Sequence, residues 1–213
     1  YTSLFTLLLA KEARQDVLDC LVDGLGALEI ASLKLDPIAE NDAGVLGLQQ
    51  ALDAAGFICH RHFRFYNWIH PVNGHSYADY MAARPARVRN TVARKQRKLE
   101  REQGYRVRLF ADDQLQQGLA DYDAVYRASW KAHEQFEDFV GELAATLSRK
   151  GWLRLAVLYI AEKPAAAQFW FVANAKASIF KLHYDPAWQQ YSPGSILTSH
   201  LMKHVIDIDR VDE

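Results

Sequence analysis

The sequence lacks the features that would assign a compartment or a cross-linked scaffold at once. Its 213 residues include two cysteines, Cys20 and Cys59, whose separation matches no metal-binding motif. A disulfide between them is one interpretation, and a reduced cytoplasmic protein is the simpler one. No apolar run approaches the ~20 residues that cross a bilayer, and the leucines at 7–9 are followed by Lys11 and Glu12, unlike a signal peptide. We therefore expect a cytoplasmic protein with no membrane partner.

An excess of charge of one sign is also absent. Lys and Arg number 25 against 26 Asp and Glu, so the net charge is −1 and the whole chain predicts no nucleic-acid partner. The sequence contains no Gly-x-Ser-x-Gly, Walker or Rossmann motif, no internal repeat and no low-complexity segment. His60 and His62 alternate, yet no third ligand follows at a diagnostic spacing. We therefore expect no metal site.

A large apolar fraction is present. Half of the residues are hydrophobic, which is enough for the core of one large domain or two small ones. The chain begins at Tyr1 without a methionine and ends at Glu213 without a breaker, so we expect it to be a piece of a longer protein.

Residues 1–75 predict a β-α-β-α-β domain. Apolar residues recur at helical spacing in 12–21 and 43–55, with Asp42 placed to cap the second helix and Gly56 to end it. Apolar alternation predicts strands in three further stretches, 1–9, 27–35 and 57–69.

Residues 76–213 predict a second domain. Periodicity and capping residues predict helices at 77–83, 86–103, 114–131, 136–149 and 195–206. The predicted strands are 105–110, 153–160, 165–172 and 178–185, the last three in an antiparallel meander. This alternation of elements indicates an α/β or α+β fold rather than a helical bundle.

The turn that opens the last predicted helix is a candidate phosphate site. It contains Tyr191, Ser192, Gly194 and Ser195. Free N–H groups in the first turn of a helix, together with the helix dipole, attract phosphate, and a glycine lets the backbone approach a pyrophosphate closely. An ordinary loop with an N-capping serine is the alternative.

The predicted strand 178–185 is a candidate for acid–base chemistry. Alternation places Ile179, Lys181, His183 and Asp185 on one face, and Phe180, Leu182 and Tyr184 on the other. A titratable face suits a cleft that needs a base and a proton donor, whereas an exposed edge strand is the alternative. Gln168 and Trp170 share a face of the preceding strand and would line the same cleft. The alternative is that Trp170 is an ordinary core residue and that the Gln168 amide makes its hydrogen bonds within the protein.

The predicted helix 86–103 has a basic side, which gathers Arg87, Arg94, Arg97, Lys98 and Arg101. Such a surface suits phosphate, whether on a nucleotide, an acyl carrier, an RNA or another polyanion. A solvated helix face is the alternative. No aromatic residue is interleaved, which argues against sequence-specific reading of single strands.

The order of these predicted helices, strands and motifs resembles the acyltransferase domain of CelD-like and BioF2-like proteins. These proteins belong to the GNAT superfamily and are relatives of the FemAB peptidyltransferases. The resemblance covers about residues 77–213. Its matching positions are Arg89, Asn90, Arg94, Arg97, Leu99, Trp130, 151–158, 165–168, 181–185, 192–194 and Leu197. Such domains typically continue into an Asp-rich segment that this chain does not reach.

The resemblance implies a fold and a reaction. The fold is a mixed, mainly antiparallel sheet flanked by helices, and residues 1–75 would be a smaller, degenerate half of the same kind. The reaction is N-acyl transfer from acetyl-CoA or another acyl-CoA to a primary amine, without a metal. The donor's pyrophosphate would lie at residues 191–195.

The resemblance also implies roles for single residues. His183 or Asp185 would handle the amine's proton, and Tyr184 would protonate the leaving thiolate. The substrate-binding candidates are Arg94, Arg97, Gln168, Trp170 and Lys181. Pro193 removes a backbone donor that typical coenzyme A sites have. An aminoacyl-tRNA donor and a non-catalytic polyanion- or partner-binding module are therefore alternatives.

Overall fold

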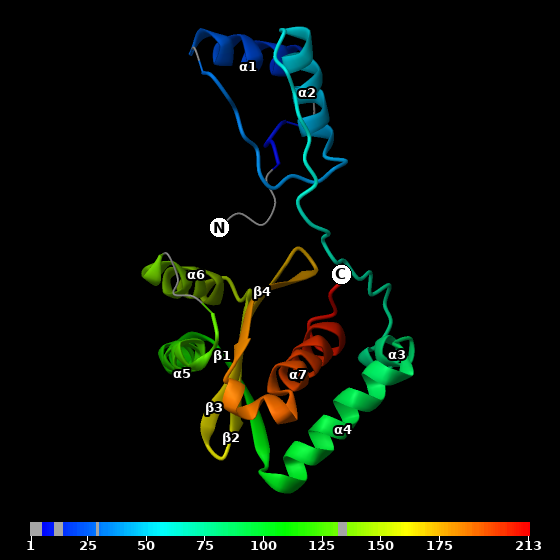
Figure 1. The fold of residues 1–213 in the computed structure, drawn as a ribbon, viewed down its shortest axis with the longest axis vertical. Coiled ribbons are helices and arrows are strands. Elements are labelled where there is room, and N and C mark those ends of the chain that lie inside the picture. Colours follow the sequence, from blue (N-terminus) through cyan, green and yellow to red (C-terminus); the bar gives the residue numbers. More distant parts are fainter. Residues whose placement is uncertain (1–5, 11–14, 29, 132–135) are drawn as a thin grey trace. The chain divides into compact units, whose positions relative to one another are not determined.

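The computed structural model of the chain describes residues 6–10, 15–28, 30–131 and 136–213 (Figure 1). The chain divides into two compact units, Tyr1–Trp68 and Ile69–Glu213. The candidate site lies in the second unit, so the first is described briefly.

The first unit contains two packed helices, α1 (Gln15–Ala27) and α2 (Ala43–Ala54). Asp42 caps α2 by accepting a hydrogen bond from the Val45 amide over 2.9 Å, as its position in the sequence predicts. The small core consists of Leu18, Val22, Leu48 and Ala51.

The described residues of this unit do not form the strands predicted for it. No described residue of 1–9, 27–35 or 57–69 belongs to a strand. Alternating apolar residues make a strand only when one face is buried, and here Leu28, Leu33, Phe63 and Trp68 are exposed. The interpretation of this region as a degenerate half-domain therefore stays a prediction.

The second unit contains five α-helices among its described residues. They are α3 (Tyr77–Ala82), α4 (Ala86–Glu102), α5 (Leu115–Ala128), α6 (Glu137–Arg149) and α7 (Pro193–Asp207). Ser76 and Asp79 form a capping box at the start of α3. Gly104, with a φ of 68°, follows the end of α4 in the left-handed conformation that glycine tolerates.

The described residues of this unit form a four-stranded antiparallel sheet in the order β1-β2-β3-β4. The strands are β1 (Tyr105–Phe110), β2 (Leu153–Ile160), β3 (Lys163–Ala173) and β4 (Lys176–Tyr184). The prediction of a mixed α/β fold with a mainly antiparallel sheet flanked by helices is confirmed.

Helices cover both faces of the sheet (Figure 1). Alternate β2 residues, Ala156 and Leu158, lie in a core with Leu197 of α7. Their neighbours Leu155 and Val157 lie in a second core with α5 and α6. On the same side of the sheet, α7 packs beside α4, the basic helix.

Candidate functional site

The start of α7 is the first part of the site. The 3-10 helix η2 (Pro186–Tyr191) precedes it, and Ser192 turns the chain with φ 55° and ψ 53°. This left-handed conformation is unfavourable for a serine and is often found where function requires a special backbone. Pro193 occupies the first helical position, and no side chain caps the helix. The first-turn amides therefore have no side-chain acceptor, as a site for an anion requires.

A groove of about 270 Å³ separates this helix start from α4. Its lining residues are Arg87, Val88, Thr91, Val92, Lys95, Ser192, Ser195 and Ile196. Two cations and three hydroxyl groups thus converge on the positive end of the α7 dipole. The ammonium group of Lys95 also donates to the carbonyl of Gln190, which joins α4 to η2.

The four residues predicted to bind phosphate have different surroundings. Ser192 and Ser195 line the groove. Gly194 lies between them, and a Cβ atom on it would come within 3.4 Å of the Tyr184 ring. Tyr191 is buried, and its hydroxyl donates to the carboxylate of Glu102 over 3.2 Å. Tyr191 thus supports the turn from behind and is absent from the groove lining.

Gln168 and Trp170 are buried, each about 1% exposed. The Trp170 indole N–H donates to Gln168 Oε1 over 2.8 Å. Gln168 Nε2 in turn donates to the Gly194 carbonyl and to Thr198 Oγ1, over 2.9 and 2.8 Å. These contacts match the alternative of a core tryptophan beside a satisfied amide, and they attach β3 to the first turn of α7.

The predicted grouping of β4 side chains is wrong for two residues, because Phe180 packs in the core on the α5 side, away from Tyr184, and Ile179 also changes face. Phe169 of β3 pairs with Lys181, but its neighbour Trp170 pairs with Ile179, so Phe180 is an extra residue in a β-bulge. Residues paired across a sheet share a face. Ile179 therefore lies on the face opposite Lys181 and His183.

His183 lies in the core on the α5 side of the sheet. It is 1% exposed, and its ring centroid is 4.3 Å from that of Tyr122 and 5.2 Å from that of Tyr126. Its Nε2 atom is 3.2 Å from the Tyr122 carbonyl. Lys181 shares this face of β4. Neither residue lines the groove beside α7.

Tyr184 lies on the α7 side, beside the start of the helix. It packs in the core that includes Ile196, and its ring is 4.8 Å from that of the exposed Trp130. Asp185 follows β4 and accepts a hydrogen bond from the Ala187 amide over 2.9 Å, which caps η2. Of the three residues predicted to transfer protons, Tyr184 is thus the one beside Gly194.

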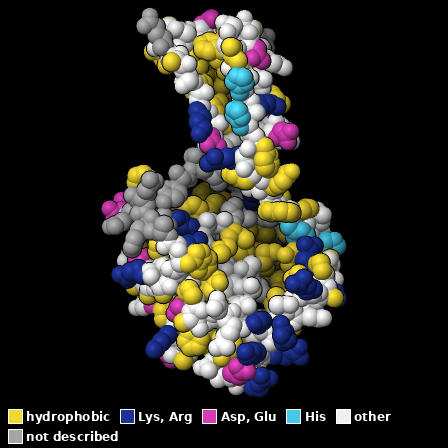
Figure 2. Space-filling view, in the orientation of Figure 1, with side chains coloured by type: hydrophobic (Ala, Val, Ile, Leu, Met, Phe, Trp, Pro, Cys, Tyr) yellow, Lys and Arg dark blue, Asp and Glu magenta, His cyan; other side chains and the backbone are white. Residues whose placement is uncertain are grey.

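The outer side of α4 has a second hollow of about 300 Å³, lined by Arg94, Arg97, Lys98 and Arg101. Figure 2 shows Lys and Arg side chains gathered over this helix. The Arg101 guanidinium, and less strongly Lys98, lowers the pKa of the Glu102 carboxyl below its usual value. Arg94 and Arg97, predicted to bind substrate, therefore lie in a strongly positive hollow beside the groove.

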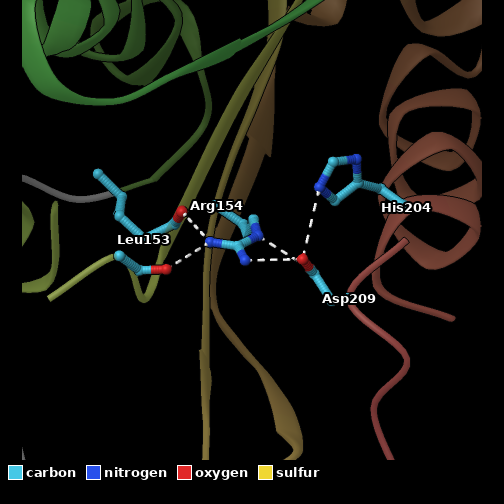
Figure 3. A network of polar contacts seen from close by, with 5 residues as sticks. Leu153, Arg154, His204 and Asp209 are labelled. Carbon is cyan, nitrogen blue, oxygen red and sulfur yellow. Dashed lines mark hydrogen bonds and ion pairs between the residues drawn. The ribbon is translucent and has the colours of Figure 1, made fainter. Parts of the chain in front are cut away.

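A mostly buried ion pair fixes the other end of α7 (Figure 3). Arg154, near the start of β2, donates to both carboxylate oxygens of Asp209 over 2.8 and 2.7 Å, and His204 Nε2 is 3.7 Å from the same carboxylate. Arg154 also donates to the carbonyls of Gly151 and Leu153. No local pattern in the sequence indicates this pair, because its partners are 55 residues apart.

Two further observations concern the described residues alone. None of their helices is long and apolar enough to cross a bilayer. They bring together no group of three or more His, Cys, Asp or Glu side chains that could hold a metal ion.

All the residues that line the groove lie in a part of the chain that matches a known protein family. The model of the acetyltransferase (GNAT) domain family matches residues 86–212, which is more than half of the chain. This chain belongs to the GNAT acetyltransferase domain family. The match begins with α4 and includes the whole sheet and α7, so the groove lies in the GNAT domain.

An N-acetyltransferase is among the solved structures that are similar to part of the chain. It is the ribosomal-protein-S18-alanine N-acetyltransferase from Escherichia coli, with 18% sequence identity and a TM-score of 0.39. The similarity covers 48% of this chain and 60% of that structure. No curated protein matches the chain.

Proposed function

We propose that this chain is an N-acyltransferase that transfers an acyl group, in the simplest case acetyl, from acyl-CoA to a primary amine. The observation that carries the proposal is the groove in the GNAT domain, where Arg87 and Lys95 face Ser192 and Ser195 at the start of α7. Cations, hydroxyl groups and helix-terminal amides are the groups that bind a pyrophosphate.

The backbone of β4 supports a place for the thioester. Beyond Ala177, whose amide donates to the Glu213 carbonyl, no described residue pairs with the outer edge of β4. The bulge at Phe180 interrupts the regular ladder within the same strand. In the proposed mechanism, backbone N–H groups along this edge polarise the thioester carbonyl and stabilise the negative charge that develops on its oxygen.

Side chains at the end of β4 are proposed to move the protons. The amine nitrogen attacks the carbonyl carbon, and the carbon–sulfur bond breaks to release a thiolate. Tyr184 is the preferred donor to that thiolate, because it lies beside Gly194 on the α7 side. Asp185, or water held near it, takes the proton that the amine loses. His183 is the less favoured base because it is buried on the other face of the sheet.

The finer assignment follows the sequence resemblance. We place the chain with CelD-like and BioF2-like acyltransferases, with the first unit as a reduced half-domain, in the cytoplasm of a bacterium.

The hollow lined by Arg94, Arg97, Lys98 and Arg101 favours a second candidate function. A surface of four cations suits the phosphates of an aminoacyl-tRNA donor or of another polyanion. A transfer RNA that binds with a steep dependence on salt, while acetyl-CoA does not bind, would favour this candidate.

Isothermal titration calorimetry with acetyl-CoA tests the main proposal. Saturable binding at one site, weakened by substitution of Arg87, is the expected result. An absence of binding by a folded protein that contains this chain would refute the proposal.

A further inference from the structure

The contacts of Gln168 form a closed hydrogen-bond network in the core. The side chain is 1% exposed, so each of its polar atoms needs a partner inside the protein. Its two N–H groups donate to the Gly194 carbonyl and to Thr198 Oγ1, and its oxygen accepts from the Trp170 indole. The Thr198 hydroxyl donates to the same Gly194 carbonyl over 3.0 Å.

Chemistry allows one orientation of this amide. The indole N–H of Trp170 is a donor only, and the Gly194 carbonyl is an acceptor only. If the Gln168 amide were flipped, its NH₂ group would face the indole N–H of Trp170, and its oxygen would face the Gly194 carbonyl. Neither contact would be a hydrogen bond. The side chain is locked with its NH₂ group toward α7, and the Gly194 carbonyl accepts hydrogen bonds from two side chains.

The Gly194 carbonyl belongs to the same peptide group as the Ser195 amide. A peptide group is planar, and in its trans form the C=O and N–H bonds point in opposite directions. Holding the carbonyl toward Gln168 and Thr198 thus aims the Ser195 N–H away from them. Ser195 lines the groove between α4 and α7. Hydrogen bonds to a carbonyl also polarise the N–H of the same group.

We infer that Gln168 is a positioning residue for the donor site: through the Gly194–Ser195 peptide it aims and polarises a backbone amide at an anionic group of the acyl donor. This inference rests on the proposed function. Gln168 does not itself line the groove. It would therefore act on the acyl donor only through the Gly194–Ser195 peptide group.

The test compares Gln168→Met with the wild type in acetyl-CoA calorimetry and in thioester-consumption kinetics. Methionine keeps the approximate volume but donates no hydrogen bond. The expected result is a Kd and a KM for acetyl-CoA that rise about tenfold, the equivalent of one lost hydrogen bond to a charged group, while kcat changes less than about threefold. Val157→Ala, in the core on the other face of the sheet, controls for lower stability and should leave KM unchanged.

Two Thr198 variants test whether the hydroxyl at this position is what lowers the KM for acetyl-CoA. Thr198→Val removes the second donor to the Gly194 carbonyl and should raise KM, whereas Thr198→Ser keeps the hydroxyl and should restore it. Gln168→Met combined with Thr198→Val should be less than additive, because both act on one peptide group.

The outcomes separate this inference from the proposed function. If the wild type fails to bind acetyl-CoA, the proposed function is wrong and the inference is wrong with it. If the wild type binds and Gln168→Met binds equally well, or loses affinity no more than Val157→Ala at the same loss of thermal stability, the positioning role alone is overturned.

Discussion

The guanidinium group of Arg154 donates two hydrogen bonds to the carboxylate of Asp209, and so joins the start of β2 to the chain just after α7. Both side chains are mostly buried, at 19% and 9% exposure. Removing one partner of a buried pair leaves the other charge without compensation. We expect Asp209→Asn to lower the free energy of unfolding by about 3 kcal/mol, as measured by urea denaturation.

An exposed pair in the same unit provides the control. Arg106 and Glu162 are 2.7 Å apart, but the Glu162 side chain is 80% exposed. Glu162→Gln should change the free energy of unfolding by less than about 1 kcal/mol. Equal losses for the two variants would contradict a structural role for the buried pair.

Tyr184→Phe tests the proposed proton donor. The change removes the hydroxyl of a ring that lies beside Gly194 and keeps the ring's contact with Trp130. We expect kcat to fall about 100-fold, the usual contribution of a general acid, while the Kd for acetyl-CoA stays the same. His183→Gln should mainly lower the melting temperature, because the ring is buried between Tyr122 and Tyr126. A larger fall in kcat for His183→Gln than for Tyr184→Phe would contradict the proton-donor role of Tyr184 and favour a catalytic role for His183.

Gly194 tests the phosphate-binding turn. A Cβ atom at this position would lie 3.4 Å from Tyr184 Cδ1, an ordinary contact. Gly194→Ala should therefore change the Kd for acetyl-CoA by less than about threefold, whereas Gly194→Trp should raise it at least about 100-fold by filling the approach to the first-turn amides. Calorimetry measures both, and unchanged affinity in a folded Gly194→Trp protein would exclude this turn as the donor site.

His200 predicts a loss of stability in acid. Burial, with the nearby Lys203 charge as a smaller cause, lowers the pKa of His200 in the folded protein below its ordinary value of 6.5. As the pH falls below 6.5, the unfolded chain takes up a proton at this position before the folded protein does. The free energy of unfolding should therefore decrease until the pH reaches the folded-state pKa.

His200→Gln should make the unfolding midpoint less dependent on pH in this range. Identical slopes for wild type and His200→Gln would show that this side chain does not contribute.

Much of the second unit could be predicted from sequence, because its local signals agree with its burial. Strand 105–110 has the observed bounds of β1, and helix 86–103 ends one residue beyond α4. Pro85 and Gly104 mark the two ends of that helix in the sequence and in the structure. The strands predicted in 1–75 are absent from the described residues, where apolar side chains such as Leu28, Phe63 and Trp68 are exposed.

The site was less predictable, because two of its features depend on how separate elements pair and pack against one another. The bulge at Phe180 changes which side chains share a face of β4, and simple alternation has no signal for an extra residue. The burial of His183 depends on α5, which the strand pattern does not contain. The role of Thr198 had a local signal, because it follows Gly194 by four residues on one helix face.

The most direct test of the central claim is calorimetry of acetyl-CoA binding to the wild type, Arg87→Gln and Arg149→Gln. Arg87 lines the groove, whereas Arg149 ends α6 and donates to Thr146. We expect one site in the wild type and no change in Kd for Arg149→Gln. For Arg87→Gln we expect a Kd about tenfold higher, the cost of one charge-assisted phosphate contact. A wild type that does not bind, or equal affinities for all three proteins, would contradict it.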